Sequence, residues 1–129
     1  MSKTVPAAVE DLLTSEPRVA HLATAHENRP HVAPLWYRYE DGTIEVMTTG
    51  KKLENITNNP RVALSVQSDN GGIPEWMVTV RGHATVIDDE EVARAQNRKL
   101  NRKYGADEDA WEENTLVRIE IGSTTHKRY

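Results

Sequence analysis

The segment VMTTGKKLENITNNPRV, from Val46 to Val62, contains the pattern from which the fold of this chain is best predicted. It reads as the end of a strand, two threonines and a glycine, two lysines, and then a short helix. The sequence Asn58-Asn59-Pro60 ends that helix, because proline lacks an amide donor and disfavours helical geometry in the residue before it. A strand that passes directly into a helix is therefore expected here.

This strand-to-helix turn is also a candidate phosphate-binding site. A helix N-terminus offers unpaired backbone N–H groups and the positive end of the helix dipole. Thr48 and Thr49 add hydroxyl donors, and Gly50 lets an anion approach the backbone closely. Lys51 and Lys52 add positive charge, which is unfavourable at a helix start by up to about 1 kcal/mol unless an anion compensates it. The alternative interpretation is that both lysines are simply solvated.

The composition bounds the kind of protein. With 129 residues, of which 37% are hydrophobic and 28% charged, the chain is predicted to form a single globular domain over residues 1–129. Its net charge of −4 disfavours binding of nucleic acid. No segment approaches the roughly 20 apolar residues of a membrane helix, and the N-terminus lacks the apolar run of a signal peptide. The cytoplasm is therefore the expected location, with no membrane partner.

Several kinds of catalytic site find no support in the sequence. The absence of cysteine excludes disulfides, thiolate metal sites and cysteine nucleophiles. No serine lies in a G-x-S-x-G motif, and neither a Walker A nor a G-x-G-x-x-G motif occurs. The five histidines lack the spacing of metal ligands, so we expect them to be solvated or structural and predict no metal site.

The alternation of apolar and polar residues predicts six strands, at residues 19–24, 31–39, 43–48, 61–67, 76–87 and 116–121. Gly82 predicts a bulge or bend within the long fifth strand. Residues 68–74 are expected to form a polar loop, and residues 107–114 an acidic, irregular segment with a helical turn that places Trp111 inward. Short connections between most strands favour a small antiparallel barrel over a parallel sheet.

About three short helices accompany these strands. Apolar residues at helical spacing predict the first, with Thr4 as its N-cap and Pro17 as its stop. The second lies in the central segment described above. Asp88 and Glu91 form a capping pair for the third, which Gly105 ends.

The order of these elements, together with three motifs, resembles the pyridoxamine 5′-phosphate oxidase-like superfamily, the FMN-binding split barrels, which also includes deazaflavin F420-dependent reductases. The motifs are TTGKKxxNIxxNPRV at residues 48–62, LAT through PLWY at residues 22–37, and TVRGHATV at residues 79–86. The resemblance covers nearly the whole chain. It implies a mainly β fold, a six-stranded antiparallel split β-barrel with Greek-key connections and about three short helices.

The resemblance also implies roles for individual residues. Lys52 matches the family's phosphate-binding lysine, and Lys51 stands where a second cation often assists it. Thr48 and Thr49 match strand-end positions beside the cofactor ring and ribityl chain. Gly50 stands where the family often has Ser or Thr, so one hydroxyl contact to the phosphate is missing.

Three more residues complete the candidate cofactor site. Trp36 matches a position that lines the ring, with packing in the core as the alternative. Met47 precedes the threonine pair on the same strand. Asn55 matches the family's helix asparagine, which either contacts the ligand or braces the loop.

The function implied by the resemblance is a flavin (FMN)-dependent oxidoreductase that acts on an unidentified small molecule. The cofactor itself carries hydride or electrons, so no catalytic side chain is assigned. Alternatives of the same fold are an F420-dependent reductase and a non-catalytic module that binds flavin or haem, with His21 or His83 as haem ligand. The family's cofactor groove lies between two protomers, which implies a homodimer. No C-terminal substrate motif of the vitamin B6 oxidases is found, since His126-Lys127-Arg128 is only superficially similar.

Overall fold

The computed structural model describes residues 5–129, so the expected Thr4 cap lies outside the described residues. Within that range the chain forms three helices and seven strands. In chain order they are α1 (Ala7–Thr14), β1 (Val19–His26), β2 (Arg29–Trp36), β3 (Arg38–Glu40), β4 (Thr43–Thr48), α2 (Gly50–Asn58), β5 (Arg61–Asn70), β6 (Ile73–Ile87), α3 (Glu90–Lys103) and β7 (Thr115–Arg128). None of these helices is long and apolar enough to cross a membrane.

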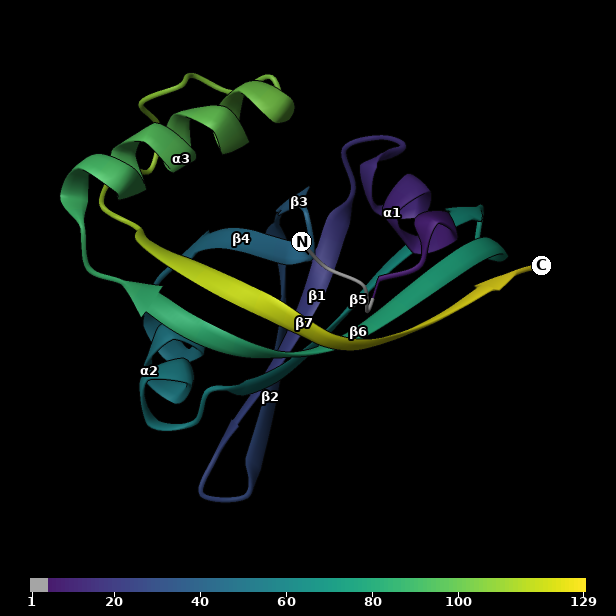
Figure 1. Ribbon diagram of the computed structural model, residues 1–129, viewed down its shortest axis with the longest axis horizontal. Coiled ribbons are helices and arrows are strands. Elements are labelled where there is room, and N and C mark those ends of the chain that lie inside the picture. Colours follow the sequence, from purple (N-terminus) through teal and green to yellow (C-terminus); the bar gives the residue numbers. More distant parts are fainter. Residues whose placement is uncertain (1–4) are drawn as a thin grey trace.

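All seven strands form one antiparallel sheet in the order β2-β1-β5-β6-β7-β4-β3 (Figure 1). The two outer strands, β2 and β3, are neighbours in the sequence, with only Tyr37 between them. A flat sheet cannot satisfy that connection, so the sheet curls until its edges meet, and β2 also contacts β4. The expected mainly β, antiparallel split-barrel fold is therefore confirmed.

The predicted number of six strands was wrong, because residues 31–39 do not form one strand. The chain leaves β1 at Trp36 and joins β4 from Arg38 onward. At the crossing, the Tyr37 side chain is completely buried, and its hydroxyl donates a 2.6 Å hydrogen bond to the carbonyl oxygen of Leu13. This bond ties the crossing to the end of α1.

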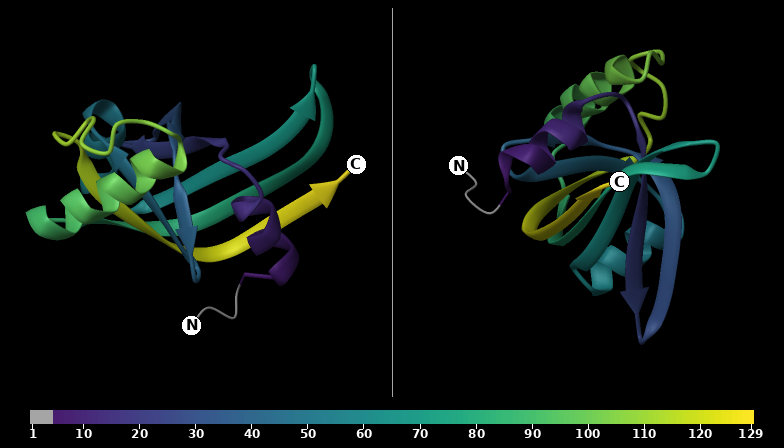
Figure 2. Two further views of the ribbon diagram at one scale, coloured as in Figure 1. Left: turned by 90° about the horizontal axis from the view of Figure 1, so that it is seen from above. Right: turned by 90° about the vertical axis from the view of Figure 1, so that its right-hand side faces the viewer.

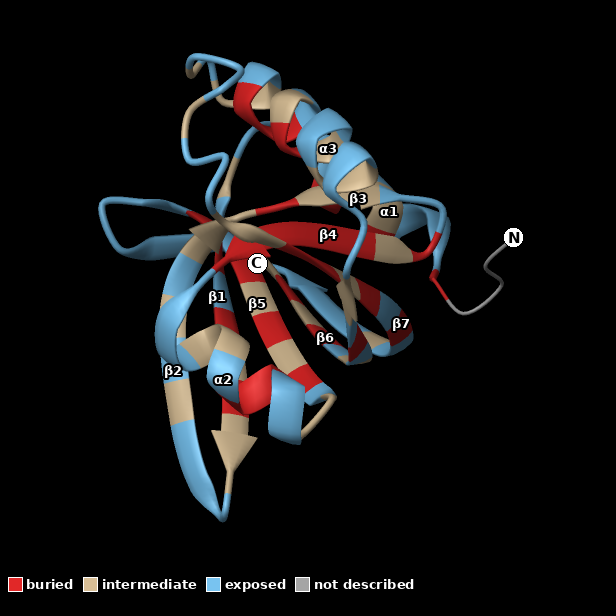
Figure 3. Ribbon diagram, turned by 90° about the vertical axis from the view of Figure 1, so that its left-hand side faces the viewer, coloured by how far each residue is buried: buried red, intermediate tan, exposed pale blue. Residues whose placement is uncertain are grey.

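The hydrophobic core has two parts. The larger part fills the barrel and includes the apolar face of α1, where Val9, Leu12 and Leu13 are buried. The smaller part lies between α3 and one end of the barrel and is built on Met47, Leu100 and Leu116. Figure 3 shows buried positions along α3 and along the strands of the barrel below it. The second part is what positions α3 beside the end of β4.

The hairpin after β5 differs from the sequence prediction. The expected loop at residues 68–74 is replaced by a two-residue turn at Gly71-Gly72, both with positive φ, and the flanking residues continue the strands. The last strand also runs beyond residue 121, to Arg128. Figure 2 shows β6 and β7 extending together beyond the barrel toward the C-terminus. Polar composition indicated a loop, but antiparallel pairing extends the ladder through it.

Two local predictions have specific outcomes. A bulge at Gly82 is confirmed, because the β6–β7 register shifts between Arg81 and Gly82. A Cβ atom at Gly82 would lie 2.6 Å from the carbonyl oxygen of Glu120, so only glycine fits there. The N-cap of α3 is Asp89 and not Asp88, since the Asp89 side chain accepts hydrogen bonds from the amides of Glu91 and Val92.

A buried carboxylate joins α3 to the sheet on the side of β4. The Glu45 side chain is only 9% exposed and accepts hydrogen bonds from Arg38 at 2.8 Å, Gln96 at 2.6 Å and Arg118 at 2.7 Å. Burial alone would raise the pKa of Glu45, but the hydrogen bonds from Arg118, Arg38 and Gln96 outweigh it and hold the pKa below its usual value. The group therefore stays ionised in the folded protein and links β3, β7 and α3 through β4.

Candidate functional site

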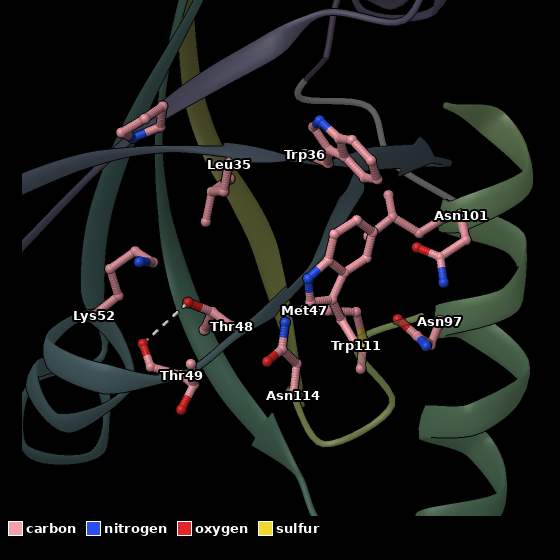
Figure 4. Close-up of a pocket in the computed structure, with 12 residues that line it drawn as sticks. Leu35, Trp36, Met47, Thr48, Thr49, Lys52, Asn97, Asn101, Trp111 and Asn114 are labelled. Atoms are coloured by element: carbon pink, nitrogen blue, oxygen red, sulfur yellow. Dashed lines mark hydrogen bonds between the residues drawn. The ribbon is translucent and has the colours of Figure 1, made fainter. Parts of the chain in front are cut away.

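A cavity of about 370 Å³ lies between the end of β4, the start of α2, the end of β2 and the inner face of α3. Figure 4 shows how its lining side chains converge from these elements. The residues are Pro34, Leu35, Trp36, Met47, Thr48, Thr49, Lys52, Asn97, Leu100, Asn101, Trp111 and Asn114. Because it combines two indoles and apolar side chains with a few polar groups, the cavity has the make-up of a small-molecule site.

One end of the cavity is polar and carries the single positive charge among the described lining residues, Lys52. Its side chain is half-buried, and no described residue forms a hydrogen bond or ion pair with it. Thr49 is the N-cap of α2, yet its side chain makes no capping hydrogen bond. The Thr48 hydroxyl is held only by a long 3.5 Å bond to the carbonyl oxygen of Thr49. A cation, a hydroxyl without a capping bond, a weakly held hydroxyl and the start of a helix thus meet at this end.

Three of the predicted site residues lie outside this cavity lining. Lys51 points away from the cavity that Lys52 lines, since adjacent residues on a helix point about 100° apart. It is exposed and forms an ion pair of 3.3 Å with Glu54. The Asn55 side chain is buried and donates a 3.0 Å hydrogen bond to the hydroxyl of Thr24, which braces α2 against β1. Gly50 has a φ of +69°, a left-handed conformation in which a larger residue would be strained.

The other end of the cavity is aromatic. The Trp36 and Tyr104 rings are stacked, with centroids 4.4 Å apart and an angle of 2° between their planes. Trp111 meets Trp36 edge-on, at 5.3 Å and 88°. The Tyr104 hydroxyl is fixed in turn, because it donates to the carbonyl oxygen of Arg18 at 2.6 Å and accepts from the amide of Tyr37 at 3.2 Å. Trp36 therefore rests on a ring that the backbone itself holds in place.

A lysine on α3 also supports the crossing residue next to Trp36. Lys103 donates a 2.6 Å hydrogen bond from Nζ to the carbonyl oxygen of Tyr37, and its Nζ lies 4.0 Å from the centre of the Tyr37 ring. Burial, with a smaller contribution from Arg38, lowers the pKa of Lys103 to about 8. Since the Tyr104 hydroxyl accepts from the Tyr37 amide, the last residue of α3 and its C-cap together satisfy both backbone groups of Tyr37, where the chain leaves the sheet.

Sequence reasoning missed the contribution of α3. Asn97 and Asn101 are both nearly completely buried and lie one helical turn apart on the face of α3 that lines the cavity. The Asn97 amide nitrogen donates to the carbonyl oxygen of Ala110 at 2.9 Å, and that of Asn101 donates to the carbonyl oxygens of Glu108 at 3.0 Å and Ala110 at 2.9 Å. The available signal was two asparagines at i and i+4 beside Leu100 on an otherwise apolar face.

The loop held by these amides brings Trp111 to the cavity. The ring turns toward the cavity and contacts Trp36, but the residue stays 50% exposed, so Trp111 does not become buried as its expected inward position implied. Of the eight predicted residues, five line the cavity, namely Trp36, Met47, Thr48, Thr49 and Lys52. Among the described residues, no group of three or more histidine, aspartate or glutamate side chains is placed to hold a metal ion.

Comparison with known proteins places this cavity in a family context. Residues 5–125 match the family model described as pyridoxamine 5′-phosphate oxidase. No curated protein sequence matches the chain. Among solved structures, an FAD-binding protein from Mesorhizobium loti is 26% identical, with a TM-score of 0.75 over 95% of this chain and 94% of that one.

Two further structures of similar length have comparable scores. An FAD-binding protein from Mycobacterium smegmatis is 26% identical, with a TM-score of 0.69 over 98% of each chain. A protein described as an F420 reductase is 25% identical, with a TM-score of 0.73 over 89% of this chain and 94% of that one. Because the family model spans nearly all of the sequence and the same fold recurs in these structures, the chain belongs to the pyridoxamine 5′-phosphate oxidase family.

Proposed function

We propose that this protein is a flavin-dependent oxidoreductase that binds FMN in the cavity and acts on a small organic molecule. Family membership and the FAD-binding proteins of similar structure support a flavin-type cofactor. The observation that carries the proposal is the placement of Lys52 with Thr48 and Thr49 at one end of a cavity whose other end is aromatic. That division suits a ligand with an anionic tail and a flat ring.

The polar end fits a phosphate group. A dianionic phosphate would accept from the Lys52 ammonium and from the hydroxyls of Thr48 and Thr49, beside the positive end of the α2 dipole. Gly50 has no side chain to contact the phosphate. Its positive φ lets α2 begin immediately after Thr49, which brings the start of the helix to this end of the cavity. Lys51 contributes to the local positive potential from outside the cavity.

The bound flavin would supply the hydride or electron chemistry, so the residues of this chain have to bind, orient and shield it. Trp36, fixed by Tyr104, would set the position of the ring, and Met47 would cover it on the side of the smaller core. No catalytic side chain is assigned. We also propose that the protein is cytoplasmic and forms a homodimer that encloses the cofactor between its two protomers. The dimer interface would cover exposed apolar residues such as Val19 and Val32.

An F420-dependent reductase is the second candidate, favoured by the similarity to a protein described as an F420 reductase. A module that binds flavin without turnover is the third. The same phosphate site would serve each of these ligands. Titrating FMN and F420 in parallel therefore decides between the first two, and reoxidation of the reduced protein by candidate acceptors decides between an enzyme and a module.

The experiment that tests the proposal compares Lys52→Met with the matched control Lys51→Met. Loss of a charged hydrogen bond to phosphate should cost about 1.5–3 kcal/mol, which weakens FMN binding roughly 10- to 150-fold. Lys51→Met removes the same charge from the neighbouring position, but Lys51 lies outside the cavity, so it should change FMN affinity by no more than about twofold. Quenching of FMN fluorescence measures both.

Riboflavin, which lacks the phosphate, separates the tail from the ring. Wild type and Lys52→Met should bind riboflavin with equal affinity. If both lysine variants weaken FMN binding alike, or if Lys52→Met weakens riboflavin as much as FMN, the phosphate site is placed wrongly.

A further inference from the structure

The aromatic end of the cavity has features that the phosphate site does not explain. We call the residues Asn97, Leu100, Asn101 and Trp111 the α3 wall. Figure 4 shows Asn97 and Asn101 on α3, opposite the end of the cavity where Lys52 lies. What this wall recognises is a separate question from what holds the cofactor tail, although its answer rests on the proposed flavin-dependent function.

The α3 wall carries no ionisable side chain, since Lys52 is the one such group among the described residues that line the cavity. The surroundings of the wall are acidic. Glu112 and Glu113 are exposed in the loop that carries Trp111, and both line a neighbouring surface hollow with the acidic start of α3. Arg94 is the one cation among the described residues that line this hollow, and Arg98 and Arg102 on the same helix are paired with Asp109 at 2.8 Å and Glu108 at 3.1 Å. This potential disfavours an anion at the wall.

Trp111 combines an unfavourable backbone conformation with a side chain that only partly packs, against Trp36. Its φ is +54°, a left-handed conformation that costs a non-glycine residue about 1–3 kcal/mol. The residue is 50% exposed at the edge of the cavity. The loop is nevertheless fixed there by Asn97 and Asn101 from α3. A flat molecule that covers the indole would bury this apolar surface and stack against it.

The two asparagines give the wall a defined polarity. Both donate to the loop through the amide nitrogen, so the oxygen is the atom left to a ligand. Figure 4 shows both amide oxygens turned toward the cavity. An amide oxygen accepts hydrogen bonds and repels a carboxylate or phosphate oxygen. The wall therefore prefers a ligand edge that carries an N–H or O–H group.

We propose that the α3 wall binds the small molecule that reacts with the flavin, and that this molecule is an uncharged planar ring compound with an N–H or O–H donor on one edge. Trp111 covers its ring and Asn97 and Asn101 accept from its donor. A phosphorylated or carboxylated substrate is excluded by the same residues. Lys52 binds the phosphate of the cofactor at the opposite end of the cavity, so the phosphate and the small molecule contact different residues.

The test uses two probes of one shape, naphthalene-2-carboxamide and naphthalene-2-carboxylate. Isothermal titration calorimetry measures each against the full chain, with and without excess FMN. The amide should bind at least about tenfold more tightly than the acid, which corresponds to about 1.4 kcal/mol. Raising the salt concentration should narrow that gap, because screening weakens the repulsion of the acid.

Variants of Trp111 connect the result to the wall. Trp111→Ala should weaken the amide about tenfold, Trp111→Phe should retain most of the affinity, and FMN affinity should stay within about twofold in both. Trp111 is half exposed, so both variants should fold, which thermal unfolding checks. FMN titration of the same samples keeps the two claims apart. If FMN fails to bind while the amide still binds through Trp111, the flavin function falls and recognition of an uncharged ring stands.

Four other outcomes would overturn the proposal. They are equal or tighter binding of the acid, no binding of the amide in either condition, unchanged amide affinity in Trp111→Ala, and an equal loss of FMN and amide affinity in that variant. The last result would mean that the wall holds the flavin ring itself.

Discussion

Replacing Tyr104 tests how the pocket is anchored to the barrel. Tyr104→Phe keeps the ring that stacks on Trp36 but removes the hydroxyl that donates to the carbonyl oxygen of Arg18 at 2.6 Å and accepts from the amide of Tyr37 at 3.2 Å. Each hydrogen bond has a net worth of about 1 kcal/mol, so the free energy of unfolding should fall by about 2 kcal/mol. The stack, and with it the position of Trp36, should survive.

Tyr104→Leu removes the stack as well as the hydroxyl. An aromatic pair adds about 0.5–1.5 kcal/mol beyond its buried area, so this variant should lose about 3 kcal/mol in total. Urea unfolding measures both losses in the free energy of unfolding, provided that its dependence on urea concentration, the m-value, is the same in the variants and the wild type. The matched control is Tyr129→Phe, which removes a hydroxyl from a ring that is 60% exposed and should change stability by less than about 0.5 kcal/mol.

FMN affinity provides the second measurement for the Tyr104 pair. Because Tyr104→Phe leaves Trp36 on its stacking partner, FMN binding should be unchanged, whereas Tyr104→Leu should weaken it several-fold. The reasoning is refuted if Tyr104→Phe costs no more stability than Tyr129→Phe. It is also refuted if the two Tyr104 variants weaken FMN binding equally.

The remaining predictions concern charge and assembly. Glu45→Gln should lower stability at pH 7 by about 1.5 kcal/mol, near the lower end for charged hydrogen bonds because Arg118 is 40% exposed. Since the folded-state pKa of Glu45 is below its unfolded value, the difference should be full above the unfolded pKa and vanish as the pH falls through the folded pKa; a pH-independent difference in chemical unfolding would contradict this. Light scattering of the FMN-loaded protein should give twice the mass of one chain, and a monomer that binds FMN tightly would rule out a shared cofactor groove.

The parts of the fold that local signals determine were predicted from the sequence. The prediction for residues 43–48 coincides with β4, and α2 ends at Asn58, just before Pro60. Gly82 was correctly assigned to a bulge, because a glycine in the interior of a long strand often marks a bulge or a tight bend. In each case the residue that decides the structure lies within a few positions of its effect.

The break at Tyr37 could not be predicted in the same way. Residues 31–39 are rich in aromatic and β-branched residues, Pro34 is the one strand-breaking residue among them, and nothing local marks Tyr37 as the point where the chain changes partner. That change follows from closure of the sheet, which depends on strands distant in the sequence, such as β7. The same limit explains Ser68, which belongs to a polar, glycine-containing segment that was predicted to be a loop. It lies in β5 because Trp76 of β6 pairs with it.

The candidate site divides along the same line. The polar end of the cavity comes from one continuous segment, Thr48 to Lys52, so a motif was enough to find it. The α3 wall needs the loop after α3 to fold back, which depends on hydrogen bonds from Asn97 and Asn101 to backbone carbonyls. Asparagine has no fixed partner in a sequence pattern, so these contacts appear only in three dimensions.

The single residue between β2 and β3 gives the binding site a mechanical role. Because Tyr37 alone joins the two edge strands of the sheet, β2 and β3, the barrel cannot flatten without displacing Tyr37 and Trp36 beside it. Lys103 and Tyr104 hold the backbone of Tyr37 in place through hydrogen bonds to its carbonyl oxygen and amide. A molecule that packs against Trp36 therefore also stabilises the closed barrel. Because such coupling is reciprocal, any change that stabilises the closed barrel should also strengthen binding of that molecule.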